Sequence, residues 1–255
     1  KMTYKIPKIF AGKPIEGAMN EALSKLEKTA KTEDENTNKN PELIVPMQGM
    51  IYVPSVNLYF DKQRTNTNLT WDKTHEALQS KKIILPETNI ERTLKMPAIY
   101  DFKEYLKYLK QNPNGVKDAT KQEVAGILDD ILTIKSPWRA EWLDAKFEQV
   151  GEDMYINYGH EFKNGKLIPK YHEKLQLCLM SNKTPGISLD EWINFSTKQG
   201  LPKPGIENGD LYYWNPVDGR VAGFIADSGG LGLSCRRDPG SSGSSHGVFA
   251  CAEGA

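Results

Sequence analysis

The stretch at residues 221–252 constrains the fold more than any other part of the chain, because its apolar residues recur at every second position. A period of two predicts β-strands with one buried face and one face that points away from the core. The apolar series is Ala222, Phe224, Ala226, Leu231, Leu233 and Cys235, and the series between them is Gly223, Ile225, Asp227, Gly232, Ser234 and Arg236. The second series has no common chemistry. We therefore interpret the outward face as a binding surface rather than a catalytic site, which needs particular groups at particular positions.

The composition of this stretch is also biased. Lys, Glu, Gln, Trp and Met make up 66 of the 255 residues, and an even distribution would place about eight of them among these 32 positions, yet none is present. All residues at the outward positions are reachable from an Asn codon by changes in its first two bases, whereas those five types are not. A solvent-facing strand that admits Arg and Asp has no physical reason to exclude Lys and Glu. A mutational bias explains the composition better.

Five phrases in this part of the chain carry a family resemblance: Asp-Leu-Tyr-Tyr-Trp-Asn-Pro at 210–216, Val-Ala-Gly-Phe-Ile-Ala-Asp-Ser at 221–228, Leu-Gly-Leu-Ser-Cys at 231–235, Arg-Asp-Pro at 237–239 and Gly-Val-Phe-Ala at 247–250. Together they resemble the C-terminal variable region of the target proteins of diversity-generating retroelements. In those systems an error-prone reverse transcriptase randomises the adenines of a template copy, and the product replaces this region of the gene.

Four upstream phrases look like the scaffold of the same proteins: Met-Ile-Tyr-Val-Pro at 50–54, Ser-Pro-Trp-Arg-Ala-Glu-Trp-Leu at 136–143, Thr-Pro-Gly-Ile-Ser-Leu-Asp-Glu-Trp at 184–192 and Gln-Gly-Leu-Pro at 199–202. The resemblance implies a C-type-lectin fold that displays the variable residues on a ligand-binding face. The sequence pattern by itself predicts only the α+β class. One departure is Phe249, where such proteins often carry Arg. Because an Asn-derived codon can give Phe, position 249 is itself a candidate varied position.

The candidate binding residues follow the outward strand phase up to Asp238 and then occupy the loop before Gly247. We expect Arg236 and Asp238 to set charge complementarity, Ile225 and Phe249 to supply apolar contact, and the glycines and serines to offer room and adaptable hydrogen bonds. The full set is Gly223, Ile225, Asp227, Gly230, Gly232, Ser234, Arg236, Asp238, Gly240, Ser242, Ser244, His246 and Phe249. Because large anchoring side chains are few, a single copy is expected to bind weakly, and avidity in an oligomer or particle would offset this.

Two kinds of catalytic site fit the sequence less well. Asp227, His246 and the serines at 241–245 are the residue types of a Ser-His-Asp hydrolase, but a flexible Gly-Ser loop holds no hydroxyl in place. The formylglycine-generating enzymes share the C-type-lectin fold and use a close pair of cysteines, whereas Cys235 and Cys251 are widely spaced in this chain. We therefore expect a protein that is not an enzyme. An enzyme of either kind remains the alternative function, and a structural particle component is the third.

The sequence predicts no metal or cofactor. Calcium-dependent lectins coordinate the ion through Glu-Pro-Asn or Gln-Pro-Asp and Trp-Asn-Asp tripeptides, but here Pro216 follows Trp214 and Asn215. The four histidines are scattered, and none pairs with another at the spacing of metal ligands. The three cysteines match no zinc pattern and are too few for a disulfide scaffold, so Cys235 is expected to act as a small buried hydrophobe.

Charge and hydropathy limit the partners. The formal net charge is zero, which argues against a nucleic-acid surface. No apolar run reaches the length of about eighteen residues that a membrane-spanning helix needs, and the first residues do not resemble a signal peptide. The expected partner is a variable protein or surface ligand, and the expected location is a virion or cell surface.

The remaining chain is expected to contain an extension and one large domain. Residues 16–30 have a helical apolar pattern and residues 33–40 are a polar linker, so residues 1–42 form an extension suited to oligomer or particle assembly. The C-type-lectin-like domain is expected at 43–255, with an insertion at about 112–175 and the variable region at about 221–252. Further expected elements are strands at 50–53, 56–60 and 211–214, helices at 69–79, 97–112 and 119–134, a turn at Asn164-Gly165, and a short helix that begins at a capping box at Ser188. Trp138, Trp142 and Trp192 are expected in the core.

Overall fold

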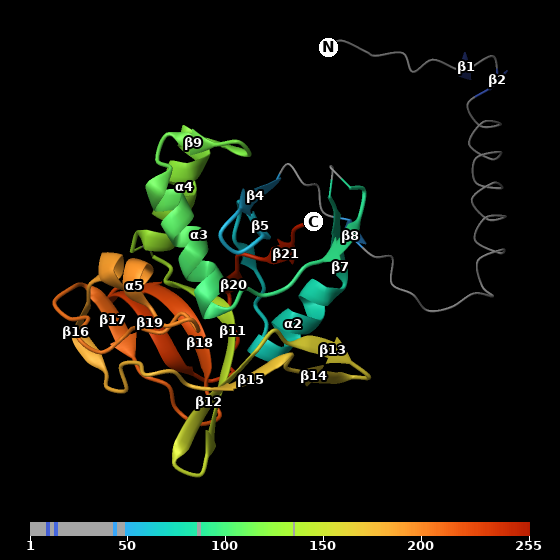
Figure 1. Ribbon diagram of the computed structural model, residues 1–255. Coiled ribbons are helices and arrows are strands. Elements are labelled where there is room, and N and C mark those ends of the chain that lie inside the picture. The colour runs from blue at the N-terminus through green and yellow to red at the C-terminus, as the bar shows by residue number, and fades with distance from the viewer. Residues whose placement is uncertain (1–8, 11–12, 15–42, 45–48, 86–87, 135) are drawn as a thin grey trace, which may run out of the picture. The chain divides into compact units, whose positions relative to one another are not determined.

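A mixed sheet of nine strands supports the C-terminal part of the chain in the computed structural model, which describes residues 9–10, 13–14, 43–44, 49–85, 88–134 and 136–255 (Figure 1). The strand order is β15-β12-β11-β18-β19-β17-β16, and β20 pairs with both β11 and β6. The strands are β6 (Thr65–Asn66), β11 (Arg139–Val150), β12 (Asp153–Tyr158), β15 (Tyr171–Lys174), β16 (Lys183–Ile187), β17 (Leu211–Trp214), β18 (Val221–Asp227), β19 (Gly230–Arg237) and β20 (His246–Val248). The fold is therefore of the α+β class, with a large mixed sheet.

The described residues also form smaller sheets. Strands β4 (Met50–Val53), β5 (Leu58–Asp61) and β21 (Cys251–Glu253) form one three-stranded sheet, and β3 (Leu43–Ile44), β7 (Lys81–Ile84) and β8 (Glu91–Thr93) form another. Three two-stranded pairs are β1 (Ile9–Phe10) with β2 (Lys13–Pro14), β9 (Gly115–Val116) with β10 (Ala119–Thr120), and β13 (Glu161–Lys163) with β14 (Lys166–Ile168). The last pair turns at Asn164 and Gly165, which both have positive φ, as the predicted turn requires.

Four helices lie within the described residues: α2 (Trp71–Gln79), α3 (Ile99–Gln111), α4 (Lys121–Leu132) and α5 (Leu189–Phe195). Their positions confirm the predicted helical patterns. Side chains cap the starts of three of them, since Thr70, Thr120 and Ser188 each accept a hydrogen bond from the backbone N–H three residues later. Helix α3 begins after Ala98, whose N–H donates to the Asp101 carboxylate at 3.2 Å.

The main core lies between the large sheet and helices α3, α4 and α5. Phe224 of β18 is 1% exposed, and its ring centroid lies 5.4 Å from that of Phe102 on α3 and 6.1 Å from that of Trp192 on α5. Ala222, Leu233 and Cys235 belong to the same buried cluster. The strands predicted from the period of two thus have the predicted inner face. A second cluster joins Trp71 and Leu78 of α2 to residues of β11, β18 and β20.

The segment at about 112–175, which the sequence analysis assigned to an insertion, contributes to the centre of the sheet. It contains β11, which pairs with β12, β18 and β20. Trp142, Leu143 and Phe147 of this strand are fully buried. A strand with neighbours on both sides and buried residues on both faces carries no alternating pattern that would mark it as a strand in the sequence.

The chain divides into two units, Lys1–Pro41 and Glu42–Ala255. The predicted helix at 16–30 and the predicted linker at 33–40 lie outside the described residues. None of the helices that the structure describes has both the length and the apolar character needed to cross a membrane.

Candidate functional site

The outward face of β18 and β19 is built from pairs of residues that lie opposite each other. Gly223 pairs with Ser234, Ile225 with Gly232, and Asp227 with Gly230. Directly opposed residues of an antiparallel pair share one face, so these six predicted residues lie on the side of the strands away from Phe224 and Leu233. The bonded neighbour β17 extends this face, because its Tyr212 and Trp214 pair with Gly232 and Ser234.

An open concavity of about 420 Å³ lies on this face. Ile225 and Ser234 are 7% and 6% exposed and form its floor, while the exposed Arg236 and Asp238 lie at its rim. The lining residues are Trp214, Ile225, Asp227, Ser234, Arg236, Arg237, Asp238 and Ser241. The structure thus brings together five of the residues that the sequence singled out, and it adds Trp214, Arg237 and Ser241.

The glycines on this face leave room for the aromatic side chains of β17. A Cβ atom on Gly232 would lie 2.5 Å from the Trp214 indole, which is too close for any real contact. At Gly230 a Cβ would meet the Tyr212 ring at 3.7 Å, and φ there is +140°, so a side chain would be strained. The residue at position 232 therefore controls where the Trp214 indole lies, and through it the shape of the concavity.

Arginines 236 and 237 have different surroundings. The Arg236 residue is exposed, whereas the Arg237 guanidinium lies over the rings of Trp138 and Trp142, at 5.6 and 5.3 Å from their centroids. Burial lowers the pKa of Arg237, and the Asp227 carboxylate opposes that shift. The difference arises from a β-bulge: Gly223 pairs with Ser234 but Val221 pairs with Arg237, so β19 carries one additional residue there.

His246 is not on the surface, contrary to the sequence analysis. It is 3% exposed, and its ring stacks on Trp142 with centroids 4.7 Å apart. Its Nε2 atom lies 2.5 Å from a terminal nitrogen of Arg237. Desolvation, followed by the nearby charge of Arg237, lowers the pKa of His246 to about 4, so the imidazole is neutral at pH 7. The reason for the misplacement is that residues 246–248 enter the sheet as β20 between β11 and β6.

Phe249 and Gly223 are also covered. Phe249 is 1% exposed and belongs to the main core, with its ring centroid 6.1 Å from that of Tyr105. The expectation that Phe249 makes ligand contacts is therefore wrong, because the chain after β20 continues into the core toward β21. Gly223 is buried, and a Cβ there would lie 3.0 Å from the carbonyl oxygen of Glu141. Gly240, Ser242 and Ser244 are exposed in the loop between β19 and β20, beside the concavity but outside its lining.

The tryptophans divide between the core and this face. Trp142 and Trp192 are fully buried, as predicted, whereas Trp138 is 40% exposed. The Trp138 ring lies edge-on to His246, with the centroids 5.5 Å apart. Its predicted core position is therefore wrong, and it belongs instead to the border of the outward face. A Trp before a strand carries no sequence signal that separates these two positions.

The groups that an enzymatic alternative would use are constrained. Cys178, Cys235 and Cys251 are free and buried, and burial raises the pKa of each thiol, so the nucleophilic thiolate is disfavoured. His246 directs its Nε2 atom to Arg237 rather than to a serine hydroxyl.

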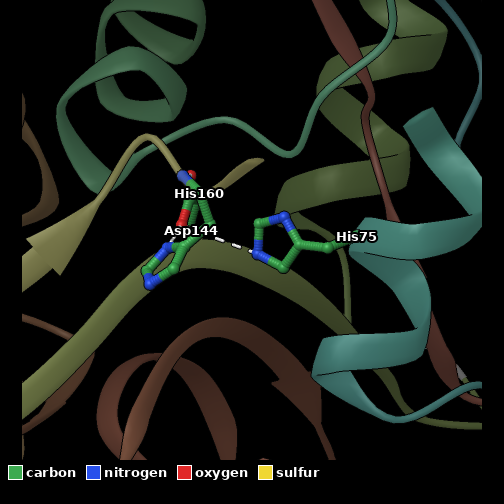
Figure 2. Close-up of side chains that lie close together, drawn as sticks. All are labelled: His75, Asp144 and His160. Atoms are coloured by element: carbon green, nitrogen blue, oxygen red, sulfur yellow. Dashed lines mark hydrogen bonds and ion pairs between the residues drawn. The ribbon is translucent and has the colours of Figure 1, made fainter. Parts of the chain in front are cut away.

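A second group of polar side chains lies apart from this face. His75 of α2, Asp144 of β11 and His160, which follows β12, lie close together and are all buried (Figure 2). The His160 Nδ1 atom is 2.5 Å and the His75 Nε2 atom 3.6 Å from Asp144 Oδ1. The spacing of the histidines in the sequence predicts no pair of metal ligands, and it does not reveal this cluster because the three residues come from distant segments of the chain.

Comparisons of the chain with models of known protein families, with curated proteins and with solved structures found no match.

Proposed function

We propose that this chain is a ligand-binding display protein of the C-type-lectin class, and that retroelement mutagenesis diversifies its C-terminal face. One observation carries the proposal. Residues drawn from a biased set of types, with no common chemistry, line a single concavity on the side of the sheet opposite the main core. A surface that tolerates replacement of its side chains while the strands beneath stay packed is what diversification of binding requires.

The geometry supports a division of this face into two parts. The fixed frame consists of Trp142, Arg237 and His246, and the changeable lining includes the exposed Arg236 and Asp238. Arg237, His246 and Trp142 contact one another and are largely covered, so their replacement would disturb packing. Arg236 and Asp238 are exposed, and the Asp238 carboxylate pairs with Arg220 at 3.0 Å. Solvent screens an exposed ion pair of this kind, so exchange at these positions costs little stability.

The lining determines what this variant can bind. Arg236, Asp227 and Asp238 place charges of both signs around the apolar Ile225 and the Trp214 indole. Such a mixed surface fits the polar rim and apolar centre of a protein surface better than a nucleic acid, which would need a concentrated positive charge. Trp214 is the one large aromatic in the lining, and we expect the affinity of a single copy to be weak. Multivalent presentation through residues 1–42 would raise the apparent affinity.

A pair of display libraries tests the proposal. One library randomises Ile225, Asp227, Ser234, Arg236 and Asp238, and a matched control library randomises five exposed positions on β13, β14 and β15: Glu161, Lys163, Lys166, Ile168 and Lys174. Selection against a panel of unrelated folded proteins should yield binders from the first library and few from the second. Equal yields from the two libraries would contradict the proposal, because they would mean that the concavity has no special capacity for recognition.

The alternatives predict other outcomes. An enzyme on the same fold would lose its activity when Asp227 is replaced, whereas a display protein would only change its specificity. For a structural particle component, binders would be rare in both libraries and assembly would depend on the outward face.

A further inference from the structure

We propose that His75, Asp144 and His160 form a binding site for a divalent transition metal ion, best suited to Zn²⁺. This inference does not depend on the display function, because the cluster lies on other elements than the outward face of β18 and β19. Two imidazoles and one carboxylate are the ligand set of sites that keep an open position for water or another ligand. Hard cations such as Mg²⁺ prefer oxygen ligands only, so the two histidines favour Zn²⁺.

The donor atoms already converge. All three ligand atoms lie within 4.8 Å of one another. The 3.6 Å separation between His75 Nε2 and Asp144 Oδ1 is close to the distance of about 3.3 Å between two ligands of a tetrahedral ion with bonds of about 2.0–2.1 Å. The His160 Nδ1 atom is nearer to the same oxygen, at 2.5 Å, and forms a hydrogen bond with it. Metal binding through the same Nδ1 atom would replace this hydrogen bond.

An unsatisfied buried atom points to a missing partner in this cluster. His75 is 2% exposed, and its Nε2 atom has no hydrogen-bond partner among the described residues. Figure 2 shows this atom directed toward Asp144. Buried polar atoms nearly always form a hydrogen bond, so an imidazole nitrogen that faces a buried carboxylate at 3.6 Å without one needs an explanation. A bound cation between them supplies one.

The surroundings of the cluster support the ligands. The His160 backbone N–H donates to Asp144 Oδ2 at 2.9 Å and orients the carboxylate. The Trp71 ring lies edge-on to both imidazoles, with centroid distances of 4.4 and 4.9 Å, and forms an apolar wall. Asp144 lines one cavity of about 500 Å³, and His160 lines a neighbouring cavity of about 510 Å³ that shares Lys95, Gly159, Tyr171 and Glu253 with the first. Two of the three residues of the cluster therefore border a cavity.

The structural consequence is a cross-link between distant elements. His75 lies on α2, Asp144 on the central strand β11, and His160 between β12 and β13. A shared ion would hold α2 against the sheet. Binding to the folded state alone would raise the melting temperature of the protein, and Mg²⁺ would not reproduce the effect.

The test uses the full chain after treatment with a chelator, and calorimetric titration with Zn²⁺. We expect one Zn²⁺ per chain, a rise of several degrees in melting temperature with Zn²⁺ but not with Mg²⁺, and the visible absorption of tetrahedral Co²⁺ when Co²⁺ is used instead. The variants His75→Gln and His160→Gln should each bind Zn²⁺ at least tenfold more weakly. His172→Gln is the matched control, because His172 is exposed on β15, and it should bind as the unaltered chain does.

Circular dichroism of the metal-free variants separates loss of the site from loss of the fold. The proposal is overturned if the folded, unaltered chain takes up no Zn²⁺. It is also overturned if folded His75→Gln and His160→Gln bind Zn²⁺ as tightly as His172→Gln does, since the ion would then be held elsewhere. In either case the cluster would be a hydrogen-bonded His-Asp pair beside an unsatisfied histidine.

Discussion

The two faces of the β18–β19 strand pair differ in how strongly the surrounding structure determines their residues. On the inner face, Phe224 and Leu233 are buried between the sheet and helices α3 and α5. On the outer face, Ile225 and Ser234 form the floor of an open concavity, and Arg236 lies at its rim. One strand pair thus combines positions that packing determines with positions that packing leaves open. Such a combination makes a diversified surface compatible with a stable fold.

The largest expected effect is on the inner face. Phe224→Ala should remove about 3–5 kcal/mol from the free energy of unfolding, because it leaves a cavity between Phe102 and Trp192. Denaturant unfolding followed by circular dichroism measures this change. A loss below about 1 kcal/mol would contradict the stated difference between the two faces, since it would mean that the inner face is not tightly packed.

Gly232 is an outer-face position where packing still matters. Gly232→Ala should lower the stability by about 1–3 kcal/mol, because the added Cβ must displace the Trp214 indole. Thermal unfolding and tryptophan emission together measure the loss and the movement of the indole. Gly240→Ala is the matched control, because the nearest atom to its Cβ would be a side-chain oxygen of Asp238 at 3.3 Å. Equal effects of the two substitutions would show that Trp214 does not depend on the glycine.

The pH dependence of stability tests whether His246 belongs to the fixed frame. His246 has a pKa lowered to about 4 in the folded state, below the value of about 6.5 in the unfolded chain, so the unfolded state binds more protons between these pH values. Its contribution to stability is complete above pH 6.5 and is lost as the pH falls toward 4. Relative to His246→Gln, the unaltered chain should lose about 1–2 kcal/mol across this window.

Urea unfolding of both proteins at several pH values measures that difference, and the subtraction removes the contributions of other groups, such as His75 and Asp101. A difference that stays constant with pH would show that His246 titrates normally and is therefore exposed. His246 would then belong to the changeable lining and not to the fixed frame.

The smallest expected effect is at the rim. Arg236→Ala should change the free energy of unfolding by no more than about 0.5 kcal/mol, because the residue is exposed. The same change should weaken binding to any ligand selected on this face. Arg237→Ala is the instructive contrast, because Arg237 lies over two tryptophan rings and contacts His246, and it should cost measurably more stability. Equal stabilities of the two variants would remove the distinction between frame and lining.

Local patterns in the sequence predicted much of the fold. The period of two at residues 221–235 predicted the inner face of β18 and β19, and apolar residues at helical spacing predicted α3 and α4. The Asn164-Gly165 pair predicted the turn between β13 and β14. In each case the signal lies within a few residues of the structure that it specifies.

Features that depend on distant partners were not predicted. Strand β11 contains two carboxylates, Glu141 and Asp144, which a buried strand accommodates only with partners. Glu141 pairs with Arg64, and Asp144 lies beside His75 and His160. Only the folded chain brings those residues together from separate elements. The positions of His246 and Phe249 were missed for a related reason, because the loop after β19 resets the phase of the alternation before β20 begins. Trp214 was missed because its place in the lining follows from the parallel pairing of β17 with β19.

We expect the residues of the outward face to vary among copies of this gene while those of the inner face do not, and deep sequencing of this locus in the source population measures this variation. Substitutions should concentrate at Ile225, Asp227, Ser234, Arg236 and Asp238, with Ala222, Phe224, Leu233 and Cys235 constant. A region as invariant as the rest of the gene, or substitutions spread equally over both faces, would contradict it.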